Sequence, residues 1–164
     1  MEIDLLIEAA EWEGVDIEAL AEIACPAALE EFGLDPSGFC ISILACNDAR
    51  ISDLNTEFRA KPVPTNVLSW PSEEIDLPLG QRPALPAPDA AGPPYELGDI
   101  AIAYETCARE AAEQSKPVAQ HVTHLLVHST LHLLGFDHIN DEDAQLMEGL
   151  ETRILAKLGV PDPY

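Results

Sequence analysis

Apolar positions along the chain follow two kinds of spacing, one typical of strands and one of helices. Strand-like apolar runs occur at residues 3–7, 39–46, 67–70 and 98–104. Helical spacing occurs at residues 17–32, 47–58, 105–115, 117–134 and 140–158. Pro26 should kink or split the first helix, and Gly33 and Gly159 should end the first and the last. The run 39–46 is almost wholly apolar, so we expect this strand to be buried on both faces.

Four strands among five or six helices predict one layered α/β (α+β) domain over residues 1–164, with a mixed sheet flanked by helices. A chain of 164 residues is long enough for one domain with a hydrophobic core. Residues 71–97 depart from this pattern, because they are rich in proline and show little periodicity. We expect them to form a mobile surface insertion.

Composition points to an ordinary globular protein, with 47% hydrophobic and 23% charged residues. The first residues carry acids where a signal peptide carries positive charge, and no stretch reaches the ~18 apolar residues of a membrane helix. We therefore expect a cytoplasmic protein that does not associate with membranes. The four cysteines form no C-x-x-C pair, which favours free thiols over a zinc ribbon or a redox motif. The net charge of −22 argues against a polyanionic partner unless positive charge gathers locally.

The strongest chemical signal is a group of histidines along the predicted helix at 117–134 and just after it. All five histidines of the chain fall in this region: His121, His124, His128, His132 and His138. The first four share one helix face, and His128 and His132 are separated by one turn, about 6 Å of rise. Gly135 can end the helix in a left-handed conformation, so that His138 returns toward the other two. The spacing therefore predicts a metal site made of His128, His132 and His138.

Three imidazoles suit one Zn²⁺ ion per chain, because they leave the fourth tetrahedral position open for water. Zinc lowers the pKa of such a water from about 15.7 to about 7, which allows hydrolysis at neutral pH. Three buried, unpaired imidazoles would destabilise a core, so we favour metal binding over packing for the set. For His121 and His124 we expect a packing role, although His124 could also lie behind a ligand histidine, and neither is needed to complete the site.

The spacing also equals that of the metzincin peptidases, H-E-x-x-H-x-x-G-x-x-H. Those enzymes use the glutamate after the first histidine as a general base, whereas this chain has Ser129, whose hydroxyl cannot accept a proton near pH 7. No glutamate occurs between Glu113 and Glu142, although a distant one could fold into the site. A peptidase-like zinc hydrolase is therefore the lesser hypothesis.

The histidine segment H-S-T-L-H-L-L-G-F-D-H at 128–138 resembles the signature of the YbeY-type endoribonucleases. Two further blocks agree, L-N-T-E-F-R followed by P-T-N-V-L-S-W-P within residues 54–71, and L-G-D-I-A-I at 97–102. The resemblance implies a zinc-dependent, single-strand-specific endoribonuclease that matures the 3′ end of 16S ribosomal RNA and serves ribosome quality control. It also implies ribosomal RNA and the ribosome or ribosomal proteins as partners.

By position, the resemblance makes His128, His132 and His138 the zinc ligands, with Arg59 and His128 as the catalytic residues. Three positions depart from the family pattern, namely Asn66 for aspartate, Trp70 for phenylalanine and Ser129 for glycine. Asn66 offers a neutral amide where the family has a carboxylate, which puts any charge-assisted hydrogen bond there in question.

Arg59 could bind substrate phosphate, since its guanidinium offers a fork of donors that matches two phosphate oxygens. The alternative is a surface arginine paired with Glu57 or Asp53. Lys61 would add a second positive charge for substrate binding. Asp137, beside a ligand, could orient an imidazole, although an exposed loop acid is an equal alternative.

Positive charge is also concentrated near these residues. Residues 47–62 hold three acids and three bases, so this segment is neutral within a very acidic chain. With a zinc ion added, the cleft would be locally positive, and we expect weak, salt-sensitive binding of RNA and no binding of DNA. A second rival hypothesis is a non-catalytic ribosome-assembly factor with structural zinc, which would need a closed four-ligand site.

Overall fold

The computed structural model describes residues 1–73, 85–86, 91–138 and 140–164. The strands are β1 Glu2–Ile7, β2 Phe39–Cys46, β3 Val67–Pro71 and β4 Tyr95–Ala103. The α-helices are α1 Ile17–Glu30, α2 Asp48–Arg59, α3 Tyr104–Glu113, α4 Val118–Leu133 and α5 Asp141–Lys157, and two short 3-10 helices are η1 Ala10–Val15 and η2 Pro36–Gly38. The predicted elements are all present, and η1 and η2 are additions that the apolar spacing did not indicate.

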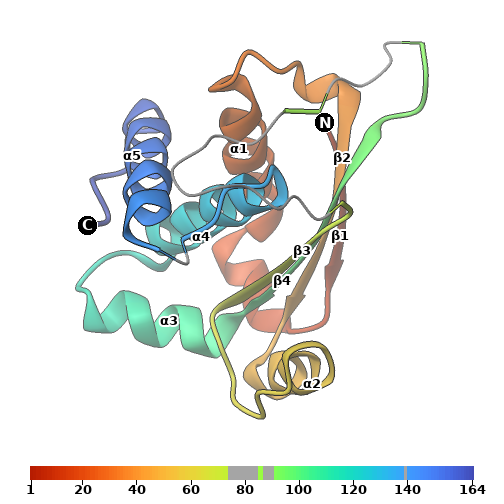
Figure 1. Ribbon diagram of the computed structural model, residues 1–164. Coiled ribbons are helices and arrows are strands. Elements are labelled where there is room, and N and C mark those ends of the chain that lie inside the picture. Colours follow the sequence, from red (N-terminus) through yellow and green to blue (C-terminus); the bar gives the residue numbers. More distant parts are fainter. Residues whose placement is uncertain (74–84, 87–90, 139) are drawn as a thin grey trace.

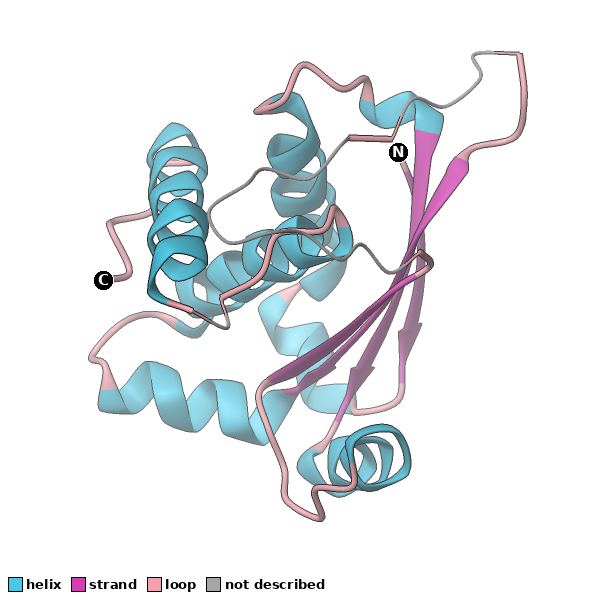
Figure 2. Cartoon of the chain, in the orientation of Figure 1, coloured by secondary structure: helices cyan, strands magenta, loops and turns pink. Residues whose placement is uncertain are grey.

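The four strands form one mixed sheet in the order β1-β2-β4-β3. The strands β1, β2 and β4 run parallel, whereas β3 is antiparallel to β4. Helices α1, α3, α4 and α5 lie on one side of the sheet, and α2 packs at one end of the other side (Figures 1 and 2). The predicted layered α/β domain with a mixed sheet is confirmed.

Two sequence expectations for the strands are wrong in detail. In β2, burial alternates, with Phe39, Ile41 and Ile43 buried and the residues between them half-exposed. Four helices cover the face to which the odd-numbered residues point, whereas α2 covers only the end of the other face, at Cys46, so most of β2 is not buried on both faces. Strand β4 begins at Tyr95, which makes the predicted insertion at 71–97 shorter, and most of its remaining residues lie outside the described part of the chain, so its predicted mobility stays a prediction.

Helix α4 runs through the centre of the helical layer. Leu126, Val127 and Leu131 are fully buried, and the helix packs against α1, α5, α3 and β3. Helix α1 is continuous through Pro26, so of the two expected effects of this proline, a kink or a split, the split does not occur. Because the rest of the helical layer surrounds α4, the polar side chains that it carries need partners from neighbouring elements.

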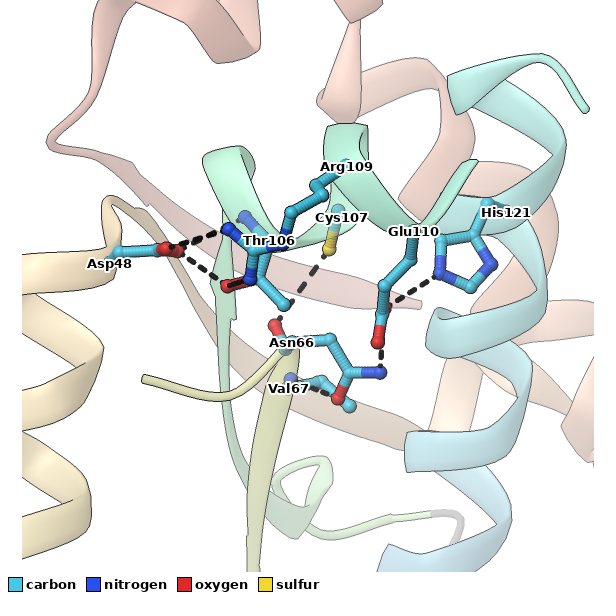
Figure 3. Close-up of polar contacts among 8 residues, drawn as sticks. All are labelled: Asp48, Asn66, Val67, Thr106, Cys107, Arg109, Glu110 and His121. Atoms are coloured by element: carbon cyan, nitrogen blue, oxygen red, sulfur yellow. Dashed lines mark hydrogen bonds and ion pairs between the residues drawn. The ribbon is translucent and has the colours of Figure 1, made fainter. Parts of the chain in front are cut away.

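Helices α2 and α3 cap each other's first turns. The Asp48 carboxylate accepts hydrogen bonds from the Thr106 backbone N–H at 3.1 Å and from its hydroxyl at 2.7 Å (Figure 3). In return, the Glu105 carboxylate accepts from the Asp48 backbone N–H at 2.9 Å. Since the first N–H groups of a helix have no partner within it, these bonds satisfy donors that would otherwise be unpaired. They also fix the start of α2 relative to α3.

We predict that Asp48→Ala lowers the free energy of unfolding by about 1–2 kcal/mol, since α3 loses its capping acceptor. Urea denaturation monitored by circular dichroism measures this, and Asp53→Ala, an exposed substitution on the same helix, is the matched control. Equal effects of the two substitutions would show that the shared capping does not stabilise the fold.

Candidate metal centre

A cavity of about 430 Å³ brings together residues from α2, β3, α4 and the loop after α4. Six of the seven site residues predicted from the sequence line it: Arg59, Lys61, His128, His132, Asp137 and His138. The seventh, His124, lies one turn before His128 on α4. Asn55, Asn66 and Ser69 also line the cavity.

After α4 the chain turns back toward the helix, as expected from Gly135. Gly135 has a φ of 106°, and the Phe136 backbone N–H donates to the Leu131 carbonyl at 3.1 Å. Phe136 is buried and stacks on Phe32 with ring centroids 5.3 Å apart, which anchors the loop. The ring of His138 consequently lies 5.0 Å from that of His128, centroid to centroid.

Each of the three histidines has an oxygen atom beside its Nδ1 nitrogen. His132 Nδ1 is hydrogen-bonded to the Ser69 hydroxyl at 2.6 Å. His128 Nδ1 lies 3.4 Å from a carboxylate oxygen of Glu151, and His138 Nδ1 lies 3.8 Å from one of Asp137. Histidines that bind metals have such an oxygen partner on the nitrogen that does not ligate. The Ser69 hydrogen bond leaves Nε2 as the nitrogen available to a metal in His132, the nearby Glu151 carboxylate favours Nε2 in His128, and the Asp137 carboxylate is too far from His138 for a hydrogen bond.

Glu151 is the residue that the sequence analysis missed. It comes from α5, is 1% exposed, and accepts from His124 Nε2 at 2.5 Å and from the Tyr164 hydroxyl at 2.9 Å. Burial alone would raise the pKa of Glu151, but the hydrogen bonds and positive charge of His124 and His128 outweigh it and bring the pKa to about 2. An ionised carboxylate can only accept, so it fixes the orientation of His124, while its second oxygen lies 3.4 Å from His128 Nδ1.

A signal for Glu151 was present in the sequence. The apolar stripe of α5 contains Met147, Leu150, Ile154 and Leu155, all buried, and Glu151 falls on the same stripe. A charged residue on the buried face of a helix needs a polar partner. The sequence does not say which partner, because that depends on how α5 packs against α4.

The surroundings of His132 favour its neutral form. Burial lowers the pKa of His132, Asp137 partly counters this, and the positive charges of His128 and Arg59 lower it further. The neutral imidazole, which is the form that binds metals, is therefore favoured at this position.

The three histidines fit a metal ion in their donor chemistry and in their location. Within the described ranges, no three His, Cys, Asp or Glu side chains are already arranged to hold a metal ion. Ligation would therefore require side-chain rotation, and the His138 side chain, 59% exposed on its loop, has the most freedom for it. His128, 21% exposed and beside Glu151, has less.

Positive charge concentrates around this cavity. Arg59 and Lys61 line it together with one acid, Asp137, and Arg59 Nη2 donates to the Ser69 carbonyl at 3.3 Å. A larger cavity of about 740 Å³ lies on the other face of the sheet, but its lining is mainly apolar, with three acids, one arginine and no histidine among the described residues. The histidine-lined cavity is therefore the candidate site, although it is the smaller of the two.

The fold and the cavity define a single-domain α/β protein with an imidazole donor set typical of metal-dependent hydrolases. Residues 4–159 match the family model described as endoribonuclease YbeY. Similar proteins with that name include one from Jannaschia sp. (strain CCS1), 58% identical over all of both chains, and one from Ruegeria pomeroyi, 57% identical over all of this chain and 98% of the relative. The chain belongs to the endoribonuclease YbeY family.

A solved structure supports the fold alone. The solution structure of TM1509 from Thermotoga maritima is 19% identical, matches with a TM-score of 0.56, and covers 96% of this chain and 91% of that one. Separately, none of the helices within the described residues is long and apolar enough to cross a membrane.

We predict that Glu151→Ala lowers the free energy of unfolding of the metal-free protein by about 2–4 kcal/mol, because His124 and Tyr164 lose a buried acceptor. Denaturation in the presence of a chelator measures this, and Glu142→Ala, exposed on the same helix, should change stability by about 0.5 kcal/mol or less. If Glu151→Ala changes the free energy of unfolding no more than Glu142→Ala does, the carboxylate does not hold the α4 histidines.

Proposed function

We propose that this protein is a zinc-dependent, single-strand-specific endoribonuclease that acts in ribosomal RNA processing, at the 3′ end of 16S ribosomal RNA, and in ribosome quality control. The observation that carries the proposal is the shared cavity, where three histidines lie beside Arg59 and Lys61, and where Ser69 and Glu151 contact the Nδ1 atoms of His132 and His128. Relatives 51–58% identical over nearly their whole length carry the name endoribonuclease YbeY, which supports an RNA substrate. Ribosomal RNA, ribosomes or ribosomal proteins in the cytoplasm are the proposed partners.

His128, His132 and His138 would hold the zinc ion through their Nε2 nitrogens. Bound zinc supplies Lewis acidity for hydrolysis of a phosphodiester bond. Glu151 and Ser69 would keep His128 and His132 in a fixed orientation and tautomer by occupying their Nδ1 nitrogens.

Arg59 and Lys61 would bind the RNA backbone. The Arg59 guanidinium uses one donor on the Ser69 carbonyl, and its other N–H groups, which have no hydrogen-bond partner in the described part of the chain, would bind phosphate oxygens. Phosphodiester cleavage gathers negative charge, and a cation held in place beside that charge stabilises the transition state. The same residues explain how a chain with a net charge of −22 could bind a polyanion at one place.

The arrangement favours a nuclease over a peptidase. Among the described residues that line the cavity, none is a glutamate that could serve as general base toward zinc-bound water. Glu151 did fold in from a distant helix, but it is buried against the Nδ1 side of His128 and does not line the cavity. Its role is therefore orientation of the histidines.

Cleavage assays on single-stranded RNA and on casein, with and without a chelator, test the proposal. We expect RNA cleavage that the chelator abolishes and added zinc restores, with no cleavage of casein. Cleavage of casein alone would establish the peptidase hypothesis. Zinc binding without cleavage of either substrate would favour a structural metal in an assembly factor.

We predict that Arg59→Ala reduces the rate of RNA cleavage by about 10²–10³-fold, because the developing negative charge loses a fixed donor. Folding and zinc content should stay as in the unsubstituted protein. Arg50→Ala is the matched control, since Arg50 lies on the same helix but pairs with Glu8 on the other side of the sheet. Undiminished cleavage by Arg59→Ala would remove Arg59 from the site.

A further inference from the structure

Asn66 stands at the start of β3, lines the cavity, and is held at both its backbone and its side chain. Its carbonyl accepts from the Ala103 backbone N–H at 2.9 Å and from the Cys107 thiol at 3.8 Å. Its side-chain Nδ2 donates to Glu110 at 3.0 Å, and its Oδ1 accepts from the Val67 backbone N–H at 2.7 Å (Figure 3). The amide therefore contacts one group that can only accept a hydrogen bond, the Glu110 carboxylate, and one that can only donate, the Val67 backbone N–H.

These two contacts fix which end of the amide is nitrogen and which is oxygen. A carboxylate accepts hydrogen bonds and a backbone N–H donates them, so a flipped amide would face both partners with the wrong atom. The amide group has a second N–H bond and a second oxygen lone pair beyond these two contacts. Asn66 can consequently offer a hydrogen bond of defined polarity to a molecule in the cavity.

Glu110 is itself held by a histidine that the metal site does not use. The oxygen atom that accepts from Asn66 also accepts from His121 Nε2 at 2.9 Å. The His121 side chain is 4% exposed, and its Nδ1 has no hydrogen-bond partner among the described residues. A buried, unpaired nitrogen destabilises a core, so packing alone does not account for an imidazole here.

The chain of contacts from His121 through Glu110 to Asn66 joins three elements that surround the cavity. His121 lies on α4, the helix that also carries His128 and His132, whereas Glu110 lies on α3 (Figure 3). The position of the Asn66 amide is thus set relative to the same helix that carries two of the proposed metal ligands.

We propose that Asn66 donates a hydrogen bond to a phosphate or ribose oxygen of the RNA strand, and that Glu110 and His121 are positioning residues that hold its amide for this contact. This inference rests on the proposed ribonuclease function. It assigns a role to His121 beyond packing.

Steady-state cleavage of single-stranded RNA by the zinc-loaded protein tests the inference. We expect Asn66→Ala to raise KM about ten-fold or more with a smaller change in kcat, since a substrate contact is lost. Glu110→Ala should raise KM by about five- to ten-fold, because the amide loses its acceptor, whereas Glu110→Gln, which keeps an accepting oxygen, should stay within about three-fold of the unsubstituted protein. Glu113→Ala, an exposed glutamate on the same helix, is the matched control and should have no effect.

The double variant Asn66→Ala with Glu110→Ala separates positioning from an independent effect. If Glu110 acts only through Asn66, the double variant is no worse than Asn66→Ala alone. If the increase in KM of the double variant equals the product of the two single increases, the inference is overturned. An unchanged KM in Glu110→Ala would also overturn it. A change in zinc content in these variants would also overturn it, since that would place the effect on the metal.

A hydrogen-exchange measurement, which does not depend on RNA cleavage, tests the positioning of Asn66 separately from the proposed function. In protein labelled with ¹⁵N-asparagine, the side-chain N–H signal of Asn66 should exchange faster with solvent in Glu110→Ala and stay protected in Glu110→Gln. No RNA cleavage by the unsubstituted protein, together with this change in exchange, would reject the ribonuclease proposal and retain the positioning. Unchanged exchange in Glu110→Ala would reject the positioning whether or not RNA is cleaved.

Discussion

Burial of a helix that carries four histidines constrains the whole structure, because each of these imidazoles needs a polar partner when it is removed from water. Those partners come from other elements: Glu110 of α3 contacts His121, Glu151 of α5 contacts His124 and His128, and Ser69 of β3 contacts His132. Each contact fixes one neighbouring element against α4. Within the described residues these contacts are on the Nδ1 atoms of His128 and His132, so the packing of the helix also orients the Nε2 atoms that the proposed metal site would use.

The charge distribution follows from the same arrangement. The chain is strongly acidic, yet the two acids that contact the α4 histidines, Glu110 and Glu151, do not line the cavity. The end of α2 brings Arg59 and Lys61 to the cavity, and the reciprocal capping by Asp48 and Glu105 fixes the other end of that helix. An anionic strand would therefore meet positive charge at the cavity and repulsion over much of the remaining surface.

Much of this fold could be predicted from the sequence, since the strand and helix spacings differ and the capping residues stand at the helix ends. The local geometry of the site could also be predicted, because the one-turn separation of His128 and His132 and the turn at Gly135 depend only on neighbouring residues. Contacts between elements could not be predicted. Neither the pairing of Glu151 with the α4 histidines nor the half-exposed face of β2 follows from local spacing, because both depend on which face of one element meets another. The start of β4 at Tyr95 was missed because Pro93 and Pro94 mask the strand pattern before it.

The central claim is that the Nε2 nitrogens of His128, His132 and His138 bind one zinc ion and leave one position for an oxygen ligand. X-ray absorption spectroscopy at the zinc edge of the purified protein tests it most directly. The account predicts three imidazole nitrogens and one oxygen at about 2.0–2.1 Å, and the loss of one imidazole contribution in His138→Ala. A sulfur ligand at about 2.3 Å, or a spectrum unchanged in His138→Ala, would contradict it.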